Sequence, residues 1–579
     1  MSLRILTELS RRYGADPAFT LAGGGNTSWK EDGGRFLHVK PSGVALAEIH
    51  EEDFVKMDRN ILRECFALGD DSVSFSSVRE REERVKKLMA YAVLSSGEEG
   101  RRPSVEAPLH EIMPFRYVVH LHPALVNAMT CGREGKRIAS DLFPDALWVD
   151  YCDPGLTLAC RVRKEMELYR TEHGGMDPAV IFLQNHGVFV GAEEVEGIDG
   201  IYAEMMDKLR HYCLERGFSL PLSKAEEADR ETVLELAPLL RGWLLPSSGT
   251  RAPVVSATGA FPIPRGPLTP DHLVYAKAFG LVSDHPDGEE ILRFREEHKY
   301  LPRMLEIPGK AVFCAGETLT AALTVRDLAE NGALIEQLAP AFGGVHYLTD
   351  SQREFIENWE VESYRASVAA GSRSGKKSSR PMSGLVAVVT GGAQGFGFGI
   401  ARYLAAEGAD VAIADLNVSG ALEAARKLGG GGCRGFSVNI ADEESVKTLF
   451  EELVSVYGGV DLFVANAGVL KAGSVKNFEL KDWKLVTDVN YNGYFLCVKH
   501  CSRLMARQNA VSGLWSDIVQ VNSKSGLAGS RANGAYAGSK FGTIGLTQSF
   551  ALELVADHIK VNSVCPGNFF DGPLWSDPE

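Results

Sequence analysis

A strand, a glycine-rich turn, a helix and a second strand follow one another between residues 385 and 415, and this order restricts the fold more than any other feature of the chain. The apolar run LVAVV leads into TGGAQGFG, a helical segment follows, and DVAIAD forms the next strand. Two parallel strands need such a crossover helix, so the run predicts the start of a doubly wound parallel sheet. Because 579 residues are too many for one hydrophobic core, we expect further domains.

The sequence pattern changes several times along the chain. Residues 1–245 alternate helix-like segments such as REREERVKKLMAYAVL with short apolar strands such as RYVVH, which predicts an α/β domain. Residues 246–368 carry no catalytic motif that we recognise, and we expect them to extend the N-terminal domain. Residues 369–383 have the composition of a linker, and their basic run is either a solvated hinge or a patch for nucleic acid or membrane. Residues 384–579 form the parallel-sheet domain.

Charge and cysteine usage restrict the partners and the compartment. The net charge is −15 and no dense run of Lys and Arg lies outside the linker, so we expect small-molecule substrates and no nucleic acid. No apolar stretch reaches transmembrane length and the N-terminus lacks the pattern of a signal peptide, so we expect no membrane association. The ten cysteines form no CxxC pair, which favours a reducing compartment, the cytoplasm.

Three histidines are candidates for a metal site. His120 and His122 lie in YVVHLHP, and residues two apart on a strand project from the same face, so both imidazoles can share one ion. His186 lies in LQNHGVFVG, where a turn between two apolar strands is expected. Three imidazoles would hold a divalent ion, most simply zinc, and leave a position open for substrate. The alternative is a strand end with histidines that only satisfy local hydrogen bonds.

Polar turns precede these histidines. LAGGGNTSWK at 21–30 and VKPSG at 39–43 have amides and hydroxyls that can receive a phosphate, although each taken singly is more often just a turn. PSVEAPLHEIM then places Glu106 shortly before the histidine pair.

The ordered set GNTS, KPSG, PSxE, HxHP and NHG resembles the class II aldolase/adducin family over about the first 240 residues. The resemblance implies that the three histidines are the metal ligands and that Glu106 is the catalytic carboxylate, which also can coordinate the metal when substrate is absent. Many members have Ser where this chain has Val105, which removes one expected phosphate hydroxyl. Adducin heads have lost the metal ligands, and their presence here favours an enzyme. The implied phosphate-binding residues are Asn26, Ser42, Gly43 and Ser104.

The resemblance implies retro-aldol cleavage of a ketose 1-phosphate. The ion would bind the carbonyl and the adjacent hydroxyl oxygen and stabilise the enediolate left after the carbon–carbon bond breaks. Glu106 would move the proton at the enediolate carbon.

The C-terminal domain contains a candidate dinucleotide site. Gly391 and Gly395 allow the backbone to turn and approach a pyrophosphate, and Gly397 allows close packing of the helix, as in a Rossmann-type fold. Asp415 ends the next strand, where a carboxylate can accept both ribose hydroxyls. Its charge would repel a 2′-phosphate, so NAD is expected rather than NADP. The alternative for Asp415 is a solvated turn residue.

Tyr536 and Lys540 are four residues apart in AYAGSKFG and share one helix face, and Ser523 precedes Tyr536 by thirteen residues. A lysine near a tyrosine can lower the phenol pKa and provide tyrosinate as a general base. With TGxxxGxG and NAG, the set resembles the short-chain dehydrogenase/reductase family over 384–579. The resemblance implies that Tyr536 is the acid/base, Lys540 holds the ribose, Ser523 positions the substrate oxygen, Asn490 supports a proton-relay water and Asn466 contacts the cofactor.

Two departures from this family are visible. Asn439 stands where relatives often have Asp at the adenine contact. The chain stops at PGNFFDGPLWSDPE, before the family's substrate loop and last helix and strand are complete, so the sequence predicts a truncated dehydrogenase that is poorly active or unable to form its usual oligomer.

The fusion as a whole is similar to the family of bifunctional rhamnulose-1-phosphate aldolase/lactaldehyde dehydrogenases of rhamnose degradation. This resemblance implies cleavage of L-rhamnulose 1-phosphate to dihydroxyacetone phosphate and L-lactaldehyde, followed by NAD-dependent oxidation of the aldehyde to L-lactate. A homo-oligomer is expected from the family. The alternatives are another sugar phosphate, a reaction on an alcohol or polyol including reduction of the aldehyde to a diol, and a non-catalytic adducin-like scaffold.

Overall fold

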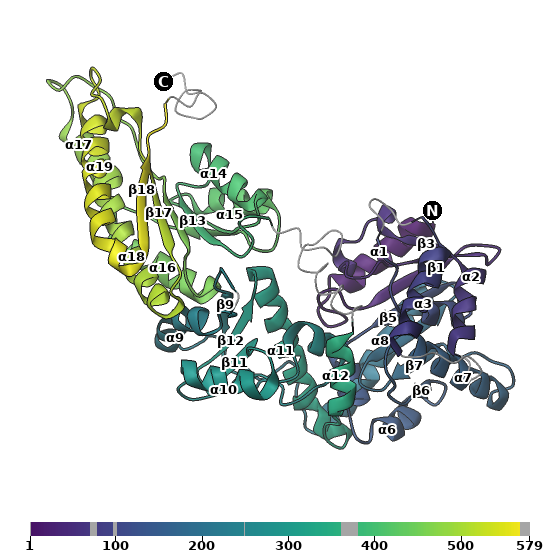
Figure 1. Ribbon diagram of the computed structural model, residues 1–579. Coiled ribbons are helices and arrows are strands. Elements are labelled where there is room, and N and C mark those ends of the chain that lie inside the picture. Colours follow the sequence, from purple (N-terminus) through teal and green to yellow (C-terminus); the bar gives the residue numbers. More distant parts are fainter. Residues whose placement is uncertain (1, 70–77, 96–100, 248, 360–379, 568–579) are drawn as a thin grey trace. The chain divides into compact units, whose positions relative to one another are not determined.

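The chain forms two compact α/β units, which are interleaved along the sequence (Figure 1). The structure, a computed structural model, describes residues 2–69, 78–95, 101–247, 249–359 and 380–567. The first unit contains Met1–Lys224, Pro262–Gly280 and Asp327–Ser378. The second unit contains Ala225–Phe261, Leu281–Arg326 and Ser379–Glu579.

The first unit is built on a mixed eight-stranded sheet. All neighbouring strands are antiparallel except β6 and β7, which are parallel. In sheet order the strands are β4 (Val93–Ser95), β3 (Val55–Asp58), β2 (Phe36–Val39), β1 (Asn26–Lys30), β5 (Tyr117–Leu121), β8 (Gly187–Ala192), β7 (Val180–Leu183) and β6 (Leu147–Val149).

Helices cover both faces of this sheet, which explains why β5 is buried along its whole length. Tyr117, Val119 and Leu121 pack in one core with α1 (Ser2–Gly14) and α8 (Val195–Glu215). Val118 points to the opposite face, into a second core. The helices of that core are α4 (Ala107–Ile112) and α7 (Leu156–Glu172), and the other helices of the unit are α2 (Arg59–Arg63), α3 (Val78–Ala92), α5 (Ala124–Thr130), α6 (Gly135–Leu142) and α12 (Asp350–Asn358).

The second unit contains a six-stranded, all-parallel sheet of the Rossmann type. Ala387 and Val389 pack with α14 (Gly395–Ala406) and α15 (Val418–Leu428) on one face. Phe463 packs against Phe450 on the other, with ring centroids 5.8 Å apart. In sheet order the strands are β15 (Arg434–Ser437), β14 (Asp410–Asp415), β13 (Val386–Thr390), β16 (Leu462–Ala465), β17 (Ser516–Val521) and β18 (Ile559–Val564). The remaining α-helices after β15 are α16 (Glu443–Tyr457), α17 (Leu480–Thr487), α18 (Gly493–Ser512) and α19 (Gly534–Leu554).

A smaller four-stranded sheet belongs to the same second unit. Helix α9 (Arg230–Trp243) accompanies it and packs against α16 and α18. The Arg241 guanidinium is buried, lies 2.9 Å from the Asp461 carboxylate and also donates to the carbonyl of Pro253 at 2.9 Å. The sheet is formed by β10 (Leu281–Val282), β11 (Met304–Ile307), β12 (Ala311–Gly316) and β9 (Val254–Thr258), next to α10 (Gly288–His298).

The units follow different boundaries from the ranges expected from sequence. Residues 225–245 pack with the dehydrogenase-like sheet instead of the N-terminal domain, because α9 buries its apolar side and Arg241 there. Residues 246–368 are divided between the two units rather than added whole to the first, and the boundary at 326/327 falls inside α11 (Leu319–Leu338). Most of the expected linker, 369–379, lies outside the described residues.

The expected elements are mostly present. RYVVH forms β5, KAVFCAG forms β12, and REREERVKK lies in α3, although the last two residues of that expected helix, Val93 and Leu94, belong to β4. The expected α/β class is confirmed for both units. Within the described residues, no helix has the length and apolar character needed to cross a membrane.

Candidate functional site

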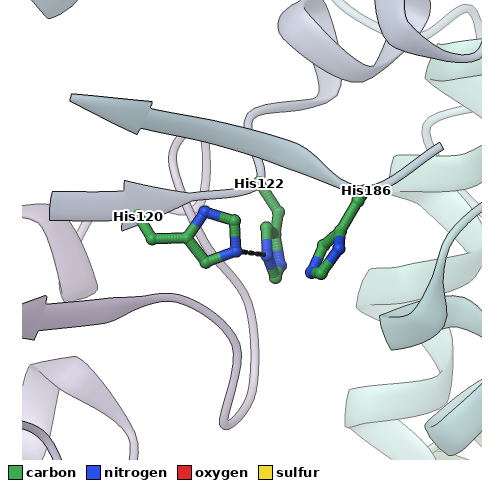
Figure 2. Close-up of side chains that lie close together, drawn as sticks. All are labelled: His120, His122 and His186. Atoms are coloured by element: carbon green, nitrogen blue, oxygen red, sulfur yellow. Dashed lines mark hydrogen bonds between the residues drawn. The ribbon is translucent and has the colours of Figure 1, made fainter. Parts of the chain in front are cut away.

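Three histidines from two neighbouring strand ends converge in the first unit (Figure 2). His120 lies on β5, His122 follows that strand, and His186 lies in the turn between β7 and β8. One ring nitrogen of each lies within 4.8 Å of the others, and all three side chains are buried. The strand alternation that predicted a shared face for His120 and His122 is confirmed, and the third expected ligand joins them.

The ring orientations fit a bound cation. His120 Nδ1 donates to the carbonyl of Val188 at 3.0 Å, and His122 Nδ1 donates to Asp271 Oδ2 at 2.5 Å. In neutral rings both Nε2 atoms therefore carry lone pairs, yet these two atoms face each other at 2.8 Å. Two facing acceptors repel each other unless a proton or a cation lies between them, and three converging imidazoles suit a divalent metal. Burial lowers the pKa of His120 to about 4, which keeps that ring neutral and able to ligate.

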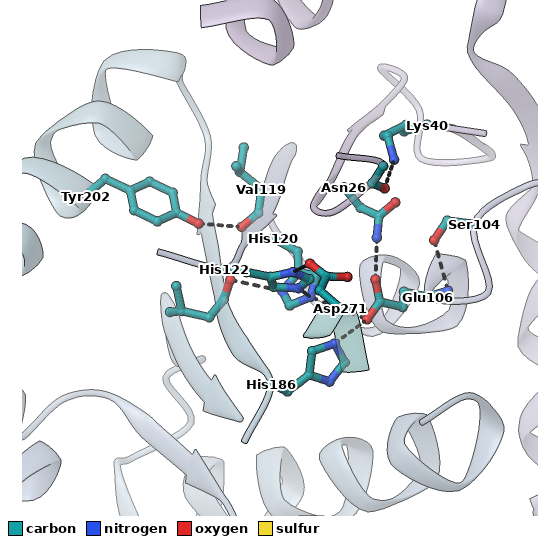
Figure 3. A network of polar contacts seen from close by, with 12 residues as sticks. Asn26, Lys40, Ser104, Glu106, Val119, His120, His122, His186, Tyr202 and Asp271 are labelled. Carbon is teal, nitrogen blue, oxygen red and sulfur yellow. Dashed lines mark hydrogen bonds and ion pairs between the residues drawn. The ribbon is translucent and has the colours of Figure 1, made fainter. Parts of the chain in front are cut away.

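Glu106 completes the cluster from the start of α4. Its Oε1 lies 3.1 Å from His186 Nε2 and 3.4 Å from His120 Nε2, and Asn26 donates a short hydrogen bond to Oε2 (Figure 3). Burial alone raises the pKa of Glu106, but His120 and His186 hold it well below its ordinary value. The carboxylate is therefore ionised beside the imidazoles, where it can act as a ligand or exchange a proton with a substrate.

The predicted phosphate residues occupy two places. Asn26 is paired with His120 across β1 and β5, and the Ser104 hydroxyl accepts from the backbone N–H of Glu106 at 3.2 Å, so both contact the cluster. Ser42 and Gly43 lie in a loop that is joined to the Ser104 loop, because the N–H of Ser42 donates to the carbonyl of Arg102 at 2.9 Å. Gly43 has φ +83°, which favours glycine.

The geometry of the turn that carries His186 accounts for the residue types on either side of this histidine. Asn185 has φ +53°, a conformation that Asn tolerates, and its side-chain amide donates to the carbonyls of Leu268 and His346 at 2.9 and 2.8 Å. A Cβ on Gly187 would lie 2.5 Å from Cδ2 of His122. Glycine is therefore required there by the packing of the histidine rings.

Asp271 is the functional candidate that the sequence analysis missed. It lies 149 positions after His122, in the GPLTPDH run that carried no recognised motif, and the residue is 4% exposed. The available signal was a carboxylate next to His272 in a segment rich in proline, which is too common a combination to indicate a site.

The second unit holds the glycine-rich turn as expected. Gly391 and Gly395 have φ +62° and +54°, and a Cβ on Gly397 would lie 2.1 Å from the carbonyl oxygen of Gly391. Asn466 fixes the turn by donating to the carbonyls of Thr390 and Gly391 at 3.0 and 3.1 Å. The N-terminus of α14 therefore opens toward the edge of the sheet where a pyrophosphate binds in such folds.

Asp415 ends β14 and supports this turn. Its Oδ2 accepts from the N–H of Ala393 at 3.1 Å, and Oδ1 accepts from the N–H of Asn417 at 3.0 Å. The side chain is partly exposed, so it can still accept hydroxyl groups of a ribose.

The four predicted catalytic residues of the second unit lie on adjacent elements. Asn490, in the π-helical turn Asp488–Asn492, exchanges hydrogen bonds with the backbone of Val469 at 2.8 and 2.9 Å. Tyr536 and Lys540 are on α19, with Lys540 Nζ 5.6 Å from the tyrosine ring centroid. Burial raises the pKa of Tyr536, while the hydroxyl of Ser523 lowers it. The lowering expected from Lys540 stays a prediction.

The pKa of Lys540 is also shifted by its surroundings. Its side chain is buried, Nζ donates to the carbonyl of Val521 at 3.1 Å, and burial lowers its pKa to about 8. The ammonium is thus held next to the sheet edge and is mostly charged at neutral pH.

Comparison with known proteins identifies two families along the chain. Residues 5–198 match the class II aldolase and adducin N-terminal domain, and residues 385–573 match the short chain dehydrogenase family. Over 194 residues the chain is 40% identical to sorbitol-6-phosphate 2-dehydrogenase of Escherichia coli (strain K12), covering 33% of this chain and 73% of that enzyme. Over 630 residues it is 25% identical to the uncharacterized oxidoreductase YuxG of Bacillus subtilis (strain 168), covering 98% of this chain and 86% of that protein.

Among solved structures, sorbitol-6-phosphate 2-dehydrogenase SrlD from Erwinia amylovora is 42% identical, with 33% of this chain and 74% of that chain covered and a TM-score of 0.31. The sequence similarities alone assign the family. The chain belongs to the short chain dehydrogenase family through its C-terminal part, and it joins this part to a class II aldolase and adducin N-terminal domain.

Proposed function

We propose that the chain is a bifunctional enzyme that cleaves a ketose 1-phosphate in its first unit and transfers a hydride between NAD and a small carbonyl or hydroxyl compound in its second. The observation that carries the proposal is the convergence of His120, His122, His186 and Glu106 in one buried set. Histidines alone would also suit a structural ion. The ionised carboxylate beside them supports catalysis, because retro-aldol cleavage needs a group that moves a proton.

The three histidines would hold a divalent metal, most simply zinc. When bound, such an ion supplies the positive charge that stabilises negative charge on the substrate oxygens during carbon–carbon cleavage. Glu106 would take the proton of the hydroxyl next to the breaking carbon–carbon bond and then return a proton to the carbon that has lost its partner. Asn26 orients Glu106 through its amide, and Ser42, Gly43 and Ser104 receive the phosphate on the neighbouring loops.

In the second unit the nicotinamide supplies or accepts the hydride. Tyr536 exchanges the proton of the substrate oxygen, and Ser523 holds that oxygen within reach of the phenol. Lys540 binds the ribose hydroxyls through its ammonium, and Asn490 keeps a proton-relay water in place. Asp415 accepts the hydroxyls of the other ribose, which favours NAD over NADP.

The most specific form of the proposal follows the resemblance of the fusion to rhamnulose-1-phosphate aldolase/lactaldehyde dehydrogenases. L-Rhamnulose 1-phosphate would give dihydroxyacetone phosphate and L-lactaldehyde. The hydrated aldehyde would then lose a hydride from carbon to NAD and a proton from oxygen to Tyr536, giving L-lactate. A tethered second site captures a reactive aldehyde at a higher effective concentration.

A second candidate concerns the dehydrogenase alone. The 40% identity to sorbitol-6-phosphate 2-dehydrogenase favours a phosphorylated polyol as its substrate. Oxidation would then occur at a secondary alcohol, which is the simpler reaction for a tyrosine acid/base.

The test incubates the purified chain with Zn²⁺, NAD and L-rhamnulose 1-phosphate, and follows dihydroxyacetone phosphate and NADH separately. Both products are expected from the wild type. Glu106→Gln should remove the aldol product while retaining bound metal, and Tyr536→Phe should remove only NADH formation. NADH from sorbitol 6-phosphate but not from L-lactaldehyde selects the second candidate. Full aldol activity in Glu106→Gln overturns the proton-transfer role, and absence of metal binding in the wild type overturns the aldolase assignment.

A further inference from the structure

Asp271 belongs to the metal cluster in space but not in sequence. It lies between the two family matches, in Pro262–Gly280, a segment that packs within the first unit. Its Oδ2 accepts from His122 Nδ1 at 2.5 Å, and both side chains are at most 8% exposed. A buried carboxylate at this distance from an imidazole makes a charge-assisted hydrogen bond.

The glycine-rich loop 23–25 makes room for this segment. A Cβ on Gly24 would lie 2.6 Å from Asp271 Oδ2, and a Cβ on Gly23 would lie 2.9 Å from the hydroxyl oxygen of Tyr275. These two glycines therefore have a packing reason besides the phosphate-binding role expected from sequence. Figure 3 shows Asp271 beside His122 within the cluster.

We propose that Asp271 is a positioning residue of the metal site, which rests on the proposed aldolase function. By accepting the Nδ1 proton, Asp271 fixes the tautomer and the plane of the His122 ring. The Nε2 lone pair is then held toward His120, where the donor set converges. A carboxylate behind a histidine ligand also makes the ring a stronger donor. The segment between the family domains thus contributes a functional side chain to the first unit.

The hydrogen bond of His120 indicates why His122 needs this partner. His120 Nδ1 donates to the carbonyl of Val188, which the sheet fixes. His122 lies beyond the end of β5, and its Nδ1 donates to Asp271 instead of to a strand carbonyl. The carboxylate of Asp271 takes that place and adds a negative charge, which offsets part of the charge of a divalent ion.

The experiment measures Zn²⁺ affinity by chelator competition and the visible absorption of the Co²⁺-loaded protein for Asp271→Asn and Asp271→Ala. Glu336→Gln is the matched control, because Glu336 is a partly buried carboxylate of the same unit that accepts from the N–H of Arg265 and the hydroxyl of Tyr347, both at 2.8 Å. We expect a loss of affinity of about 10- to 100-fold for Asp271→Asn, a larger loss for Asp271→Ala, and no change for the control. Thermal unfolding and NADH binding verify that each variant is folded.

The outcomes separate this inference from the function on which it rests. Affinity within twofold of the wild type in both Asp271 variants overturns the positioning role and leaves the aldolase assignment standing. A wild type that binds no metal overturns both. If both variants fail to fold, ¹⁵N NMR of the histidine rings in the wild type decides: an Nδ1-protonated His122 is expected, and an Nε2-protonated ring contradicts the proposal.

Discussion

Replacing Gly187 with alanine should displace two histidines of the proposed metal site, although the φ of this residue itself tolerates a side chain. Gly187 follows His186 and begins β8, and its φ is not in the positive range that disfavours side chains. The added Cβ would lie 2.5 Å from Cδ2 of His122, 2.6 Å from the carbonyl oxygen of Leu121 and 3.3 Å from Cε1 of His120. One methyl group therefore meets both histidines of the β5 pair.

The size of the displacement follows from these distances. Ordinary contacts of a Cβ begin at 3.4 Å, so the His122 ring must move by about 3.4 − 2.5 = 0.9 Å unless the strand shifts instead. Metal–nitrogen distances in a competent site vary by only about 0.2 Å. A shift several times larger removes one ligand from the set, and we expect Zn²⁺ affinity to fall by at least about 100-fold.

The assay is chelator competition for Zn²⁺, with Gly200→Ala as the control. Gly200 lies in α8 of the same unit, and a Cβ there meets no atom within 4 Å. This control should keep wild-type affinity and gain about 1 kcal/mol of stability from better helix propensity. Wild-type affinity in a folded Gly187→Ala variant would refute the claim that the glycine is there to admit the two rings.

Three further results are expected. Burial raises the pKa of Asp410 from 3.8 to about 6. The free energy of unfolding should therefore fall by about 3 kcal/mol in total as the pH rises from about 4 to about 6. Asp410→Asn keeps an acceptor for the N–H of Leu319 and should resist urea better than the wild type at pH 7 but not at pH 4. Tyr536→Phe should slow hydride transfer about 10²- to 10⁴-fold in stopped-flow NADH measurements, whereas Tyr403→Phe, at an exposed tyrosine of α14, should not change the rate. A chelator should abolish aldol cleavage, followed as dihydroxyacetone phosphate, and leave NADH binding unchanged; loss of NADH binding would contradict separate sites.

Periodicity predicted much of both sheets because the central strands are buried on both faces. RYVVH and LVAVV are short apolar runs, and the bounds of β5 and β13 nearly coincide with them. The glycine-rich turn could also be predicted from the sequence, because Gly391, Gly395 and Gly397 occupy positions where φ or close packing excludes a side chain. Local sequence carries this information because each constraint acts within a few residues.

The histidine pair was predictable for the same reason, but the hydrogen bond from His122 to Asp271 was not. His120 and His122 are two apart on one strand, so the strand period alone brings them together. Asp271 reaches His122 only through the tertiary packing of a segment that has no periodic signal. Contacts between positions 149 apart depend on how whole elements pack, and no local pattern encodes them.

The placement of residues 225–245 in the second unit has the same physical origin. Helix α9 is adjacent in sequence to the aldolase-like domain, yet Arg241 carries a buried charge that Asp461, next to β16, neutralises at 2.9 Å. Gln508 of α18 lies 3.4 Å from the same guanidinium. Removing α9 would take away this partner of Asp461 and the helix that packs on α16 and α18. The dehydrogenase unit therefore begins, in energetic terms, with residues that precede its family match by more than a hundred positions, and it has to be studied together with 225–261 and 281–326.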